Sequence, residues 1–242
     1  MRVLITGGSG TLGRHLAGAP SLKGMSLSIP SSQQFDVTDP TAATRVFTDL
    51  RPELVIHCAA RIRTRGSESQ EDRWAMSRVN VYGTGVIAQA AEAARSRLLY
   101  VSTDFVFDGS KPGGLYVEDD VPCPLGYYAL SKFGGEAVAL RHPDALCVRT
   151  SFNASWPYPK AFTDRFTSKL PAAQAAEELA RTALSGLTGL LHVGGPRRSY
   201  FEFARALGAD VSPMTLAEIS SPDPLPVDTS LCSERWRRHR AP

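Results

Sequence analysis

"RVLITGGSGTLG", residues 2–13, is the stretch that decides the fold. Its first five residues are rich in aliphatic and β-branched side chains without polar alternation, as in a strand buried on both faces of a parallel sheet. Three glycines follow at a spacing of three residues. Gly7 permits a tight turn, Gly10 lets the backbone approach a pyrophosphate, and Gly13 allows the next helix to pack closely against the strand. The stretch therefore predicts a dinucleotide-binding loop between the first strand and the first helix.

Aliphatic runs of the same kind recur along the first 150 residues, at 54–58, 97–102 and 145–150. Segments with helical spacing of apolar residues lie between them. One begins with Asp39 as N-cap and Pro40 at the first helical position, and another spans residues 78–95. Strands that alternate with helices predict right-handed crossovers. The fold class that we expect is α/β, a Rossmann-type doubly wound parallel sheet.

The composition of the sequence changes after residue 150, where "SFNASWPYPKAF" contains aromatic residues and prolines that disfavour a long regular element. We therefore expect an NAD(P)-binding Rossmann domain over residues 1–151 and a small substrate-side region over residues 152–242. Helices are expected at 171–184 and near 200–207. Residues 187–195 are expected to return to the main sheet.

Composition limits the functions to consider. The chain has 242 residues, 43% of them hydrophobic, and a net charge of +3 that concentrates in "ERWRRHR" near the C-terminus. Such a run is usually a solvated helix face, so we predict no nucleic-acid binding. The four cysteines show no CxxC spacing, which predicts neither a metal site nor a disulfide framework. Because no signal peptide or membrane span is recognisable, the cytoplasm is the expected compartment.

The second strand bears on the choice of cofactor. An acidic residue at its end binds the adenosine ribose and favours NAD in folds of this kind. We place that strand at residues 25–30, and "SSQQ" follows it. Ser31 and Ser32 could hydrogen-bond a 2′-phosphate, with Arg14 as a charge partner. This favours NADP(H) over NAD(H) without excluding NAD(H).

"YYALSK", residues 127–132, places Tyr128 and Lys132 on one face of a helix. The pair could be two residues of an ordinary helix. A tyrosine hydroxyl has an ordinary pKa near 10, however, and an ammonium group beside it lowers that pKa toward the range useful in acid–base catalysis. About 25 residues earlier, "YVSTDFVFDG" ends a predicted strand in hydroxyl residues, where α/β sheets present groups to ligands. Together the two stretches favour an active site.

The motifs now span almost the whole chain in one order: "GGSGTLG", "FDVTDP", "HCAA", "STDFVFDG", "PLGYYALSKFGGE", "VRTS" and "LLHVGGP". In these residues the sequence resembles the extended short-chain dehydrogenase/reductase superfamily and, within it, the dTDP-4-dehydrorhamnose reductase (RmlD-like) branch. The strand end "STDFVFDG" combined with Y-x-x-x-K and "GGE" is specific to that branch.

The resemblance implies a role for each matching position. Tyr128 would donate a proton to a substrate carbonyl, Lys132 would hold the nicotinamide ribose and lower the tyrosine pKa, and Thr103 would bind the carbonyl oxygen. Asn80 would help to order the active-site helix. The remaining cofactor positions are Gly10, Thr11 and Leu12 at the pyrophosphate, Asp36 and Val37 on the adenine side, and Ala59, Ala60 and Arg61 over the cofactor. The remaining substrate positions are Asp104 and Phe152. Each position also has a simpler interpretation. Asn80 could only hydrogen-bond backbone, Asp36 could cap a turn, and Asp104 could brace its own loop. Arg61 could belong to a solvated basic loop with the arginines at 63 and 65.

The chain also departs from the family pattern. Arg61 stands where the family usually has histidine, Phe152 where it usually has tryptophan, and the stretch from 152 to about 171 is shorter. We therefore expect an NAD(P)H-dependent reductase acting in carbohydrate biosynthesis on a carbonyl, the keto group of a nucleotide-activated deoxysugar. A non-catalytic NADP-binding regulatory subunit on the same fold remains the alternative. The resemblance also allows a homodimer.

Overall fold

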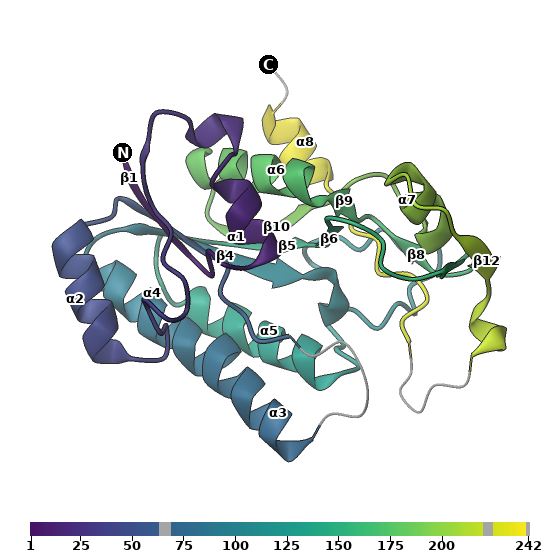
Figure 1. The fold of residues 1–242 in the computed structure, drawn as a ribbon, viewed down its shortest axis with the longest axis horizontal. Helices are drawn as coiled ribbons and strands as arrows, with labels where there is room; N and C mark the ends of the chain where they lie inside the picture. The colour runs from purple at the N-terminus through teal and green to yellow at the C-terminus, as the bar shows by residue number, and fades with distance from the viewer. Residues whose placement is uncertain (63–68, 220–224, 241–242) are drawn as a thin grey trace.

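The computed structural model describes residues 1–62, 69–219 and 225–240. A central sheet carries helices on both faces, and a smaller lobe from the C-terminal half extends beyond one end of the sheet (Figure 1). Helices α2, α3, α4 and α5 cover one face, while α1, α6 and α8 cover the other. The expected α/β fold with a Rossmann-type parallel sheet is confirmed.

Six parallel strands form this sheet in the order β10-β5-β4-β3-β1-β2. Their bounds are β1 Arg2–Thr6, β2 Ser26–Ser28, β3 Leu54–His57, β4 Arg97–Thr103, β5 Ala145–Thr150 and β10 Gly189–Val193. The chain leaves β1 for β2 on one side and returns for β3 on the other. In open α/β sheets this switch point creates the crevice that holds a ligand, at the carboxyl ends of the strands.

The helices of the main body include those expected after the glycine loop, after Asp39 and at Tyr128, and also α3, which the sequence did not predict. They are α1 Thr11–Leu16, α2 Pro40–Leu50, α3 Gln70–Met76, α4 Thr84–Ala93, α5 Tyr127–Ala139, α6 Ala172–Leu184 and α8 Glu234–Arg240, with short turns η1 Pro20–Leu22 and η3 Asp104–Val106. Asp39 caps α2 as predicted, because its carboxylate accepts hydrogen bonds from the amides of Thr41 and Ala42. Between α3 and α4 the helix widens into a π-helical turn, η2 Ser77–Gly83, that the periodicity did not predict.

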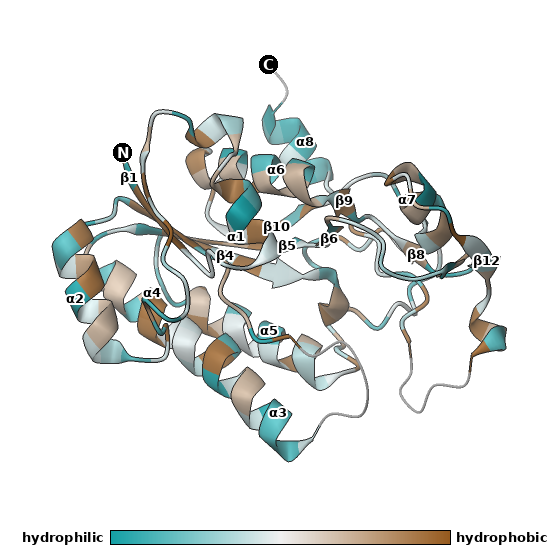
Figure 2. Ribbon diagram, viewed as in Figure 1, coloured by the Kyte–Doolittle hydropathy of each residue, from teal (hydrophilic) through white to brown (hydrophobic). Residues whose placement is uncertain are grey.

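Alternate residues of each strand build two apolar layers. Val3 and Ile5 of β1 face a cluster that includes α1 and α6, whereas Leu4 faces a cluster that includes α2 and α4. Hydrophobic residues accordingly run along much of the sheet, while other parts of it, such as β5, are paler (Figure 2). Burying each large aliphatic side chain contributes about 1.5–3 kcal/mol, so these layers fix the sheet and with it the strand ends. None of the described helices is long and apolar enough to cross a membrane.

The smaller lobe consists of short elements. They are β6 Phe152–Asn153, β7 Lys160–Phe162, β8 Phe166–Thr167, β9 Leu170–Pro171, β11 Arg198–Ser199, α7 Tyr200–Ala206, β12 Ser212–Met214 and η4 Leu216–Glu218. Strand β10 belongs instead to the main sheet, where it pairs with β5. The lobe lies beyond the carboxyl ends of β4 and β5, so it faces the same edge of the sheet as the glycine loop (Figure 1).

Candidate active site

The glycine loop forms the turn that a dinucleotide requires. Gly7 has φ +74°, and a Cβ there would lie 2.7 Å from the backbone nitrogen of Ala59. The amide of Gly10 donates to the carbonyl of Gly7 (3.0 Å), and Gly10 then starts α1. A Cβ on Gly13 would lie 2.5 Å from the Gly7 oxygen. The backbone therefore makes a cradle at the switch point that side chains would fill, which fits a pyrophosphate.

The loop after β3 is tied to the active-site helix by Asn80. The buried Asn80 amide accepts from the backbone amide of Arg61 (2.7 Å) and donates to the Arg61 carbonyl (3.0 Å) and to the hydroxyl of Ser131 on α5 (2.8 Å). Ala59 and Ala60 are therefore held between Gly7 and α5, while the Arg61 side chain is exposed. Residues 63 and 65, two further arginines of the sequence, lie outside the described residues.

The positions expected on the adenine side differ from one another in exposure. β2 ends at Ser28 and no acid directly follows it; Ser31 is half-buried and Ser32 is exposed. Asp36 accepts from the amide and the hydroxyl of Thr38, both at 2.8 Å, and these bonds hold the pKa of Asp36 below its ordinary value. Its carboxylate caps this turn, as the simpler interpretation expected, while Val37 is buried in the core.

The structure brings Thr103 and Tyr128 together. Thr103 ends β4, and its hydroxyl accepts from the amide of Phe105 (3.2 Å). Tyr128, on the first turn of α5, is half-buried. Burial and the charge of Asp104 raise the Tyr128 pKa, while a hydrogen bond with the Thr103 side chain opposes this shift. Two hydroxyl groups on different elements thus meet at the carboxyl edge of the sheet.

Lys132 lies one turn further along α5 and points into the protein. Its ammonium donates to the carbonyl of Val101 (2.7 Å) and lies 4.1 Å from the ring centroid of Tyr100. Burial lowers the Lys132 pKa to about 8. Lys132 is not among the groups that shift the Tyr128 pKa, so the expected lowering of that pKa by Lys132 stays a prediction.

A buried ion pair holds α5 against the sheet. The sequence did not predict a functional role for either of its residues. Glu136 accepts from two nitrogens of Arg149 on β5 (2.9 and 2.8 Å) and from the hydroxyl of Ser102 (2.5 Å). Both charged side chains are only 3% exposed. Ser102 directly precedes Thr103, so the pair fixes the helix and the strand end that carry the site. The only signal in the sequence was the trailing "GGE" of the helix motif.

His57 is a second buried polar group, next to the strand end that leads into the glycine loop. Its two ring nitrogens lie 2.6 Å from the hydroxyl of Thr6, at the end of β1, and 3.1 Å from the hydroxyl of Thr84. Burial and the positive charge of Lys132 lower the His57 pKa to about 3, so the ring is neutral near neutral pH. It therefore serves as a neutral hydrogen-bonding link between β1, β3 and α4.

The positions expected on the substrate side come from the end of β4 and from the smaller lobe. Asp104 is fully buried and accepts from the hydroxyl of Thr229 (2.8 Å) and, more weakly, from that of Thr103 (3.3 Å). Asp104 thus braces its surroundings and also lies near the hydroxyls of Thr103 and Tyr128. Phe152 starts β6 and is half-buried.

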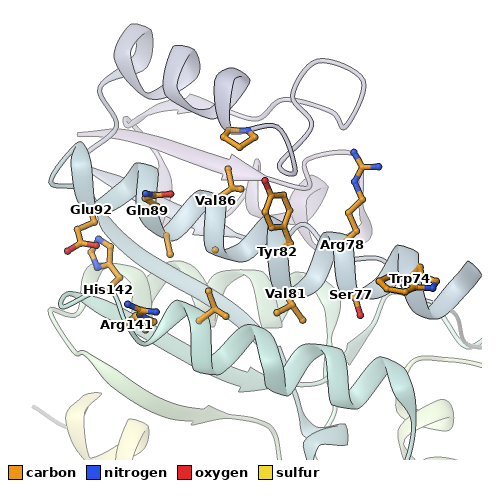
Figure 3. Close-up of a pocket in the computed structure, with 14 residues that line it drawn as sticks. Trp74, Ser77, Arg78, Val81, Tyr82, Val86, Gln89, Glu92, Arg141 and His142 are labelled. Atoms are coloured by element: carbon orange, nitrogen blue, oxygen red, sulfur yellow. The ribbon is translucent and has the colours of Figure 1, made fainter. Parts of the chain in front are cut away.

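A groove of about 1020 Å³ opens elsewhere, on the outer face of α3, α4 and α5 (Figure 3). Its lining includes Trp74, Tyr82 and Val138 but none of the residues expected to bind cofactor or substrate. Trp74 and Tyr82 are 68% and 53% exposed. The groove is therefore separate from the candidate site at the edge of the sheet.

Comparisons with known proteins agree with this geometry. The model of the family described as RmlD substrate binding domain matches residues 1–175. The chain belongs to this family. It is 33% identical to a dTDP-4-dehydrorhamnose reductase of Mycobacterium tuberculosis over 265 residues, covering 97% of this chain and 86% of that relative. The family places it among the NAD(P)-dependent oxidoreductases of the extended short-chain dehydrogenase/reductase type.

Two further relatives of this RmlD-family protein bear on its function. The solved structure of a dTDP-4-dehydrorhamnose reductase from Bacillus anthracis, in complex with NADP, is 25% identical with a TM-score of 0.87 and covers 99% of this chain and 92% of that chain. The methionine adenosyltransferase 2 subunit beta of Rattus norvegicus is 37% identical over 152 residues, covering 58% of this chain and 43% of the subunit. The similarity that extends over nearly the whole chain is thus to the reductases, whereas the similarity to the regulatory subunit covers little more than half of it.

Proposed function

We propose that this protein is an NAD(P)H-dependent reductase that acts on the keto group of a nucleotide-activated deoxysugar, with dTDP-4-dehydrorhamnose as the first substrate to test. The observation that carries the proposal is the meeting of the Thr103 and Tyr128 hydroxyls at the same sheet edge as the glycine loop. The names of the relatives that match most of the chain support the substrate class.

The residues divide the chemistry among them. A bound NAD(P)H supplies the hydride, and the loop of Gly7, Gly10 and Gly13 holds its pyrophosphate. Thr103 binds the carbonyl oxygen, and the Tyr128 hydroxyl donates the proton as negative charge develops on that oxygen. The Tyr128 hydroxyl is protonated near neutral pH, and a positive charge beside it would lower its raised pKa and so make it a better proton donor. In this proposal Lys132 holds the nicotinamide ribose.

Replacing Tyr128 by phenylalanine tests the proton donor. We expect the variant to lose most reductase activity with dTDP-4-dehydrorhamnose and to bind NADPH within a few-fold of the wild type. Tyr127→Phe is the matched control, because that neighbouring hydroxyl bonds to Ser77 (2.7 Å) rather than to Thr103. Wild-type turnover in Tyr128→Phe would show that another group donates the proton.

The cofactor that we propose is NADP(H) in preference to NAD(H). No acid directly follows β2, and Ser31, Ser32 and Arg14 remain as partners for a 2′-phosphate. The Bacillus anthracis relative was solved with NADP. Calorimetric titrations with NADPH and NADH at matched ionic strength would test this preference, and equal affinities would contradict it.

A non-catalytic regulatory subunit is the second candidate, favoured by the similarity to methionine adenosyltransferase 2 subunit beta over 58% of this chain. Such a protein would not need the reacting groups, yet Thr103, Tyr128 and Lys132 are all present in this chain. NADPH binding without turnover of any nucleotide keto-sugar would favour the regulatory role.

We also propose that a second copy of this chain covers the groove on α3, α4 and α5. Arg78 lies toward one end of the groove and Glu92 toward the other (Figure 3). Two copies related by a twofold axis, with their helices antiparallel, would bring these opposite charges together and bury Trp74. Trp74→Glu is expected to turn a dimer into a monomer in light-scattering measurements, and a wild-type monomer at micromolar concentration would contradict the proposal.

The compartment that we propose is the cytoplasm. The four cysteines are all free thiols: Cys58, Cys123, Cys147 and Cys232. Free thiols persist where glutathione and thioredoxin keep cysteines reduced. Cell fractionation with the native gene product would test this assignment.

A further inference from the structure

The C-terminal lobe buries two cations that have no acidic partner. Arg165, just before β8, and Lys169, just before β9, are 7% and 8% exposed. Within the described part of the chain, no carboxylate oxygen lies within 4.0 Å of either charge. The equally buried Arg149, in contrast, forms an ion pair with Glu136. Burying an unpaired charge destabilises a protein, so a pair of such cations calls for a functional explanation.

Both cations converge on one tyrosine. The guanidinium carbon of Arg165 lies 4.7 Å from the ring centroid of Tyr200, and the ammonium nitrogen of Lys169 lies 5.8 Å from it. Tyr200 is 7% exposed, and its hydroxyl has no hydrogen-bond partner in the described structure. Buried polar groups are rarely left unpaired, so this hydroxyl is an independent sign of a missing ligand.

The hydrogen bonds within the protein leave most donors of the two cations unused. The Lys169 ammonium donates to the hydroxyl of Ser151 (2.6 Å), which leaves two of its three N–H groups. Arg165 donates through Nε to the carbonyl of Pro226 (2.9 Å), and its terminal nitrogens donate to no described residue. Asp104, the acid whose charge acts on Lys169, already accepts two hydrogen bonds from hydroxyl groups.

The cluster lies next to the reacting hydroxyls. The Lys169 nitrogen is 5.6 Å from the ring centroid of Phe105, whose amide donates to Thr103. Ser151, the partner of Lys169, directly follows β5, whose last residue pairs with Thr103 in the sheet. A ligand that reaches Thr103 with its carbonyl can therefore place a neighbouring anionic group against the two cations.

We propose that Arg165, Lys169 and the Tyr200 hydroxyl bind the diphosphate of the substrate. This inference rests on the proposed function, in which the substrate is a nucleotide sugar. A diphosphate carries at least two negative charges between the nucleoside and the sugar, which matches two cations. Arginine offers paired N–H groups to phosphate oxygens and lysine offers a compact charge, so the set suits phosphate chemistry. The site is separate from the glycine loop, which binds the cofactor through its backbone.

The first test measures two properties of one variant, the thermal midpoint and the affinity for dTDP, which are expected to respond differently. Lys169→Met removes a buried charge without a counter-charge, so the thermal midpoint without ligand is expected to stay the same or rise. The affinity for dTDP is expected to fall at least tenfold. If Lys169 merely held Ser151 in place, the midpoint would fall while the dTDP affinity of the folded protein stayed unchanged, and this would overturn the inference.

The second test locates the affinity in the diphosphate. NADPH-saturated protein is titrated with dTDP and with thymidine. The wild type is expected to bind dTDP at least tenfold more tightly than thymidine, and Arg165→Gln and Lys169→Met are expected to abolish that difference without changing NADPH or thymidine affinity. Arg205→Gln is the matched control, because this arginine is exposed on α7. Unchanged dTDP affinity in the Arg165 and Lys169 variants would overturn the inference.

Turnover separates this inference from the proposed function. If the wild type reduces dTDP-4-dehydrorhamnose and the Arg165 and Lys169 variants keep its KM, the diphosphate site is wrong and the reductase stands. If the wild type binds UDP or GDP instead of dTDP, and the variants lose that binding, the site is supported and the thymidine nucleotide is wrong. A wild type that binds none of the three nucleoside diphosphates overturns the inference.

Discussion

Replacing Glu136 by glutamine is expected to destabilise the protein more than most single changes on α5. The carboxylate accepts three hydrogen bonds, at 2.9 and 2.8 Å from Arg149 and at 2.5 Å from Ser102, in a site where both charged side chains are 3% exposed. Glutamine has nearly the same shape but leaves the guanidinium without a counter-charge. Removing one partner of a buried ion pair costs about 3–5 kcal/mol. In a domain of this size, that loss lowers the thermal midpoint by about 6–20 °C.

Urea and thermal unfolding of three variants would measure the effect. The double variant Glu136→Leu/Arg149→Met removes both charges and is expected to recover most of the lost stability, because apolar side chains replace a buried pair at little net cost. Arg238→Gln is the control: its pair with Glu234 on α8 is exposed and is expected to contribute only about 0.3–0.5 kcal/mol. A loss below about 1 kcal/mol in Glu136→Gln would refute the reasoning, since a buried guanidinium cannot lose its counter-charge so cheaply.

Three further predictions concern the cofactor side. Gly7→Ala is expected to weaken NADPH binding and to destabilise the protein more than Gly113→Ala. The two sites have nearly the same φ, +74° and +75°, but only a methyl group on residue 7 would meet backbone, 2.7 Å from the Ala59 nitrogen. Calorimetry with NADPH and thermal unfolding of both variants would measure the difference. Asn80→Ala leaves the backbone of Arg61 and the hydroxyl of Ser131 without their hydrogen-bond partner. The free energy of unfolding in urea is therefore expected to fall by about 1–3 kcal/mol, and kcat is expected to fall as well. The His57 pKa is about 3 in the native protein against an ordinary 6.5, so between these values only the unfolded chain takes up the proton and stability falls as the pH falls. His57→Gln is expected to flatten that part of the curve of urea midpoint against pH, and a curve parallel to the wild type would contradict this.

Local signals in the sequence predicted most of the main sheet. The glycine spacing identified the first turn, and Asp39 followed by Pro40 identified the start of α2, because caps and turns depend on residues next to one another. The closeness of Thr103 and Tyr128 was also foreseeable, since the crossover helix that contains Tyr128 begins at the edge of the sheet where β4 ends.

Contacts between distant segments explain what could not be predicted. The π-helical turn Ser77–Gly83 surrounds Asn80, whose side chain bonds to residues 19 and 51 positions away. No residue within the turn itself signals this widening. The Lys132 ammonium donates to the Val101 carbonyl because α5 packs closely against β4. A Y-x-x-x-K spacing carries no information about that packing, so it could not predict whether the ammonium would lie beside Tyr128 or beside Val101.

The two anion sites differ in what builds them, and this difference explains why one was visible in the sequence and the other was not. The cofactor site is made by backbone, so it requires glycines at fixed spacing and leaves a motif. The proposed diphosphate site is made by long side chains from the ends of short strands, where many sequences could supply a cation. Arg165 and Lys169 both lie in the stretch from 152 to about 171 that is short in this chain, beside Phe152 in place of the family's usual tryptophan. If both proposals hold, the groups that carry out the reduction lie at the edge of the main sheet, whereas the choice of substrate depends on this lobe. Substitutions there are expected to change KM for nucleotide sugars while leaving the affinity for NADPH unchanged.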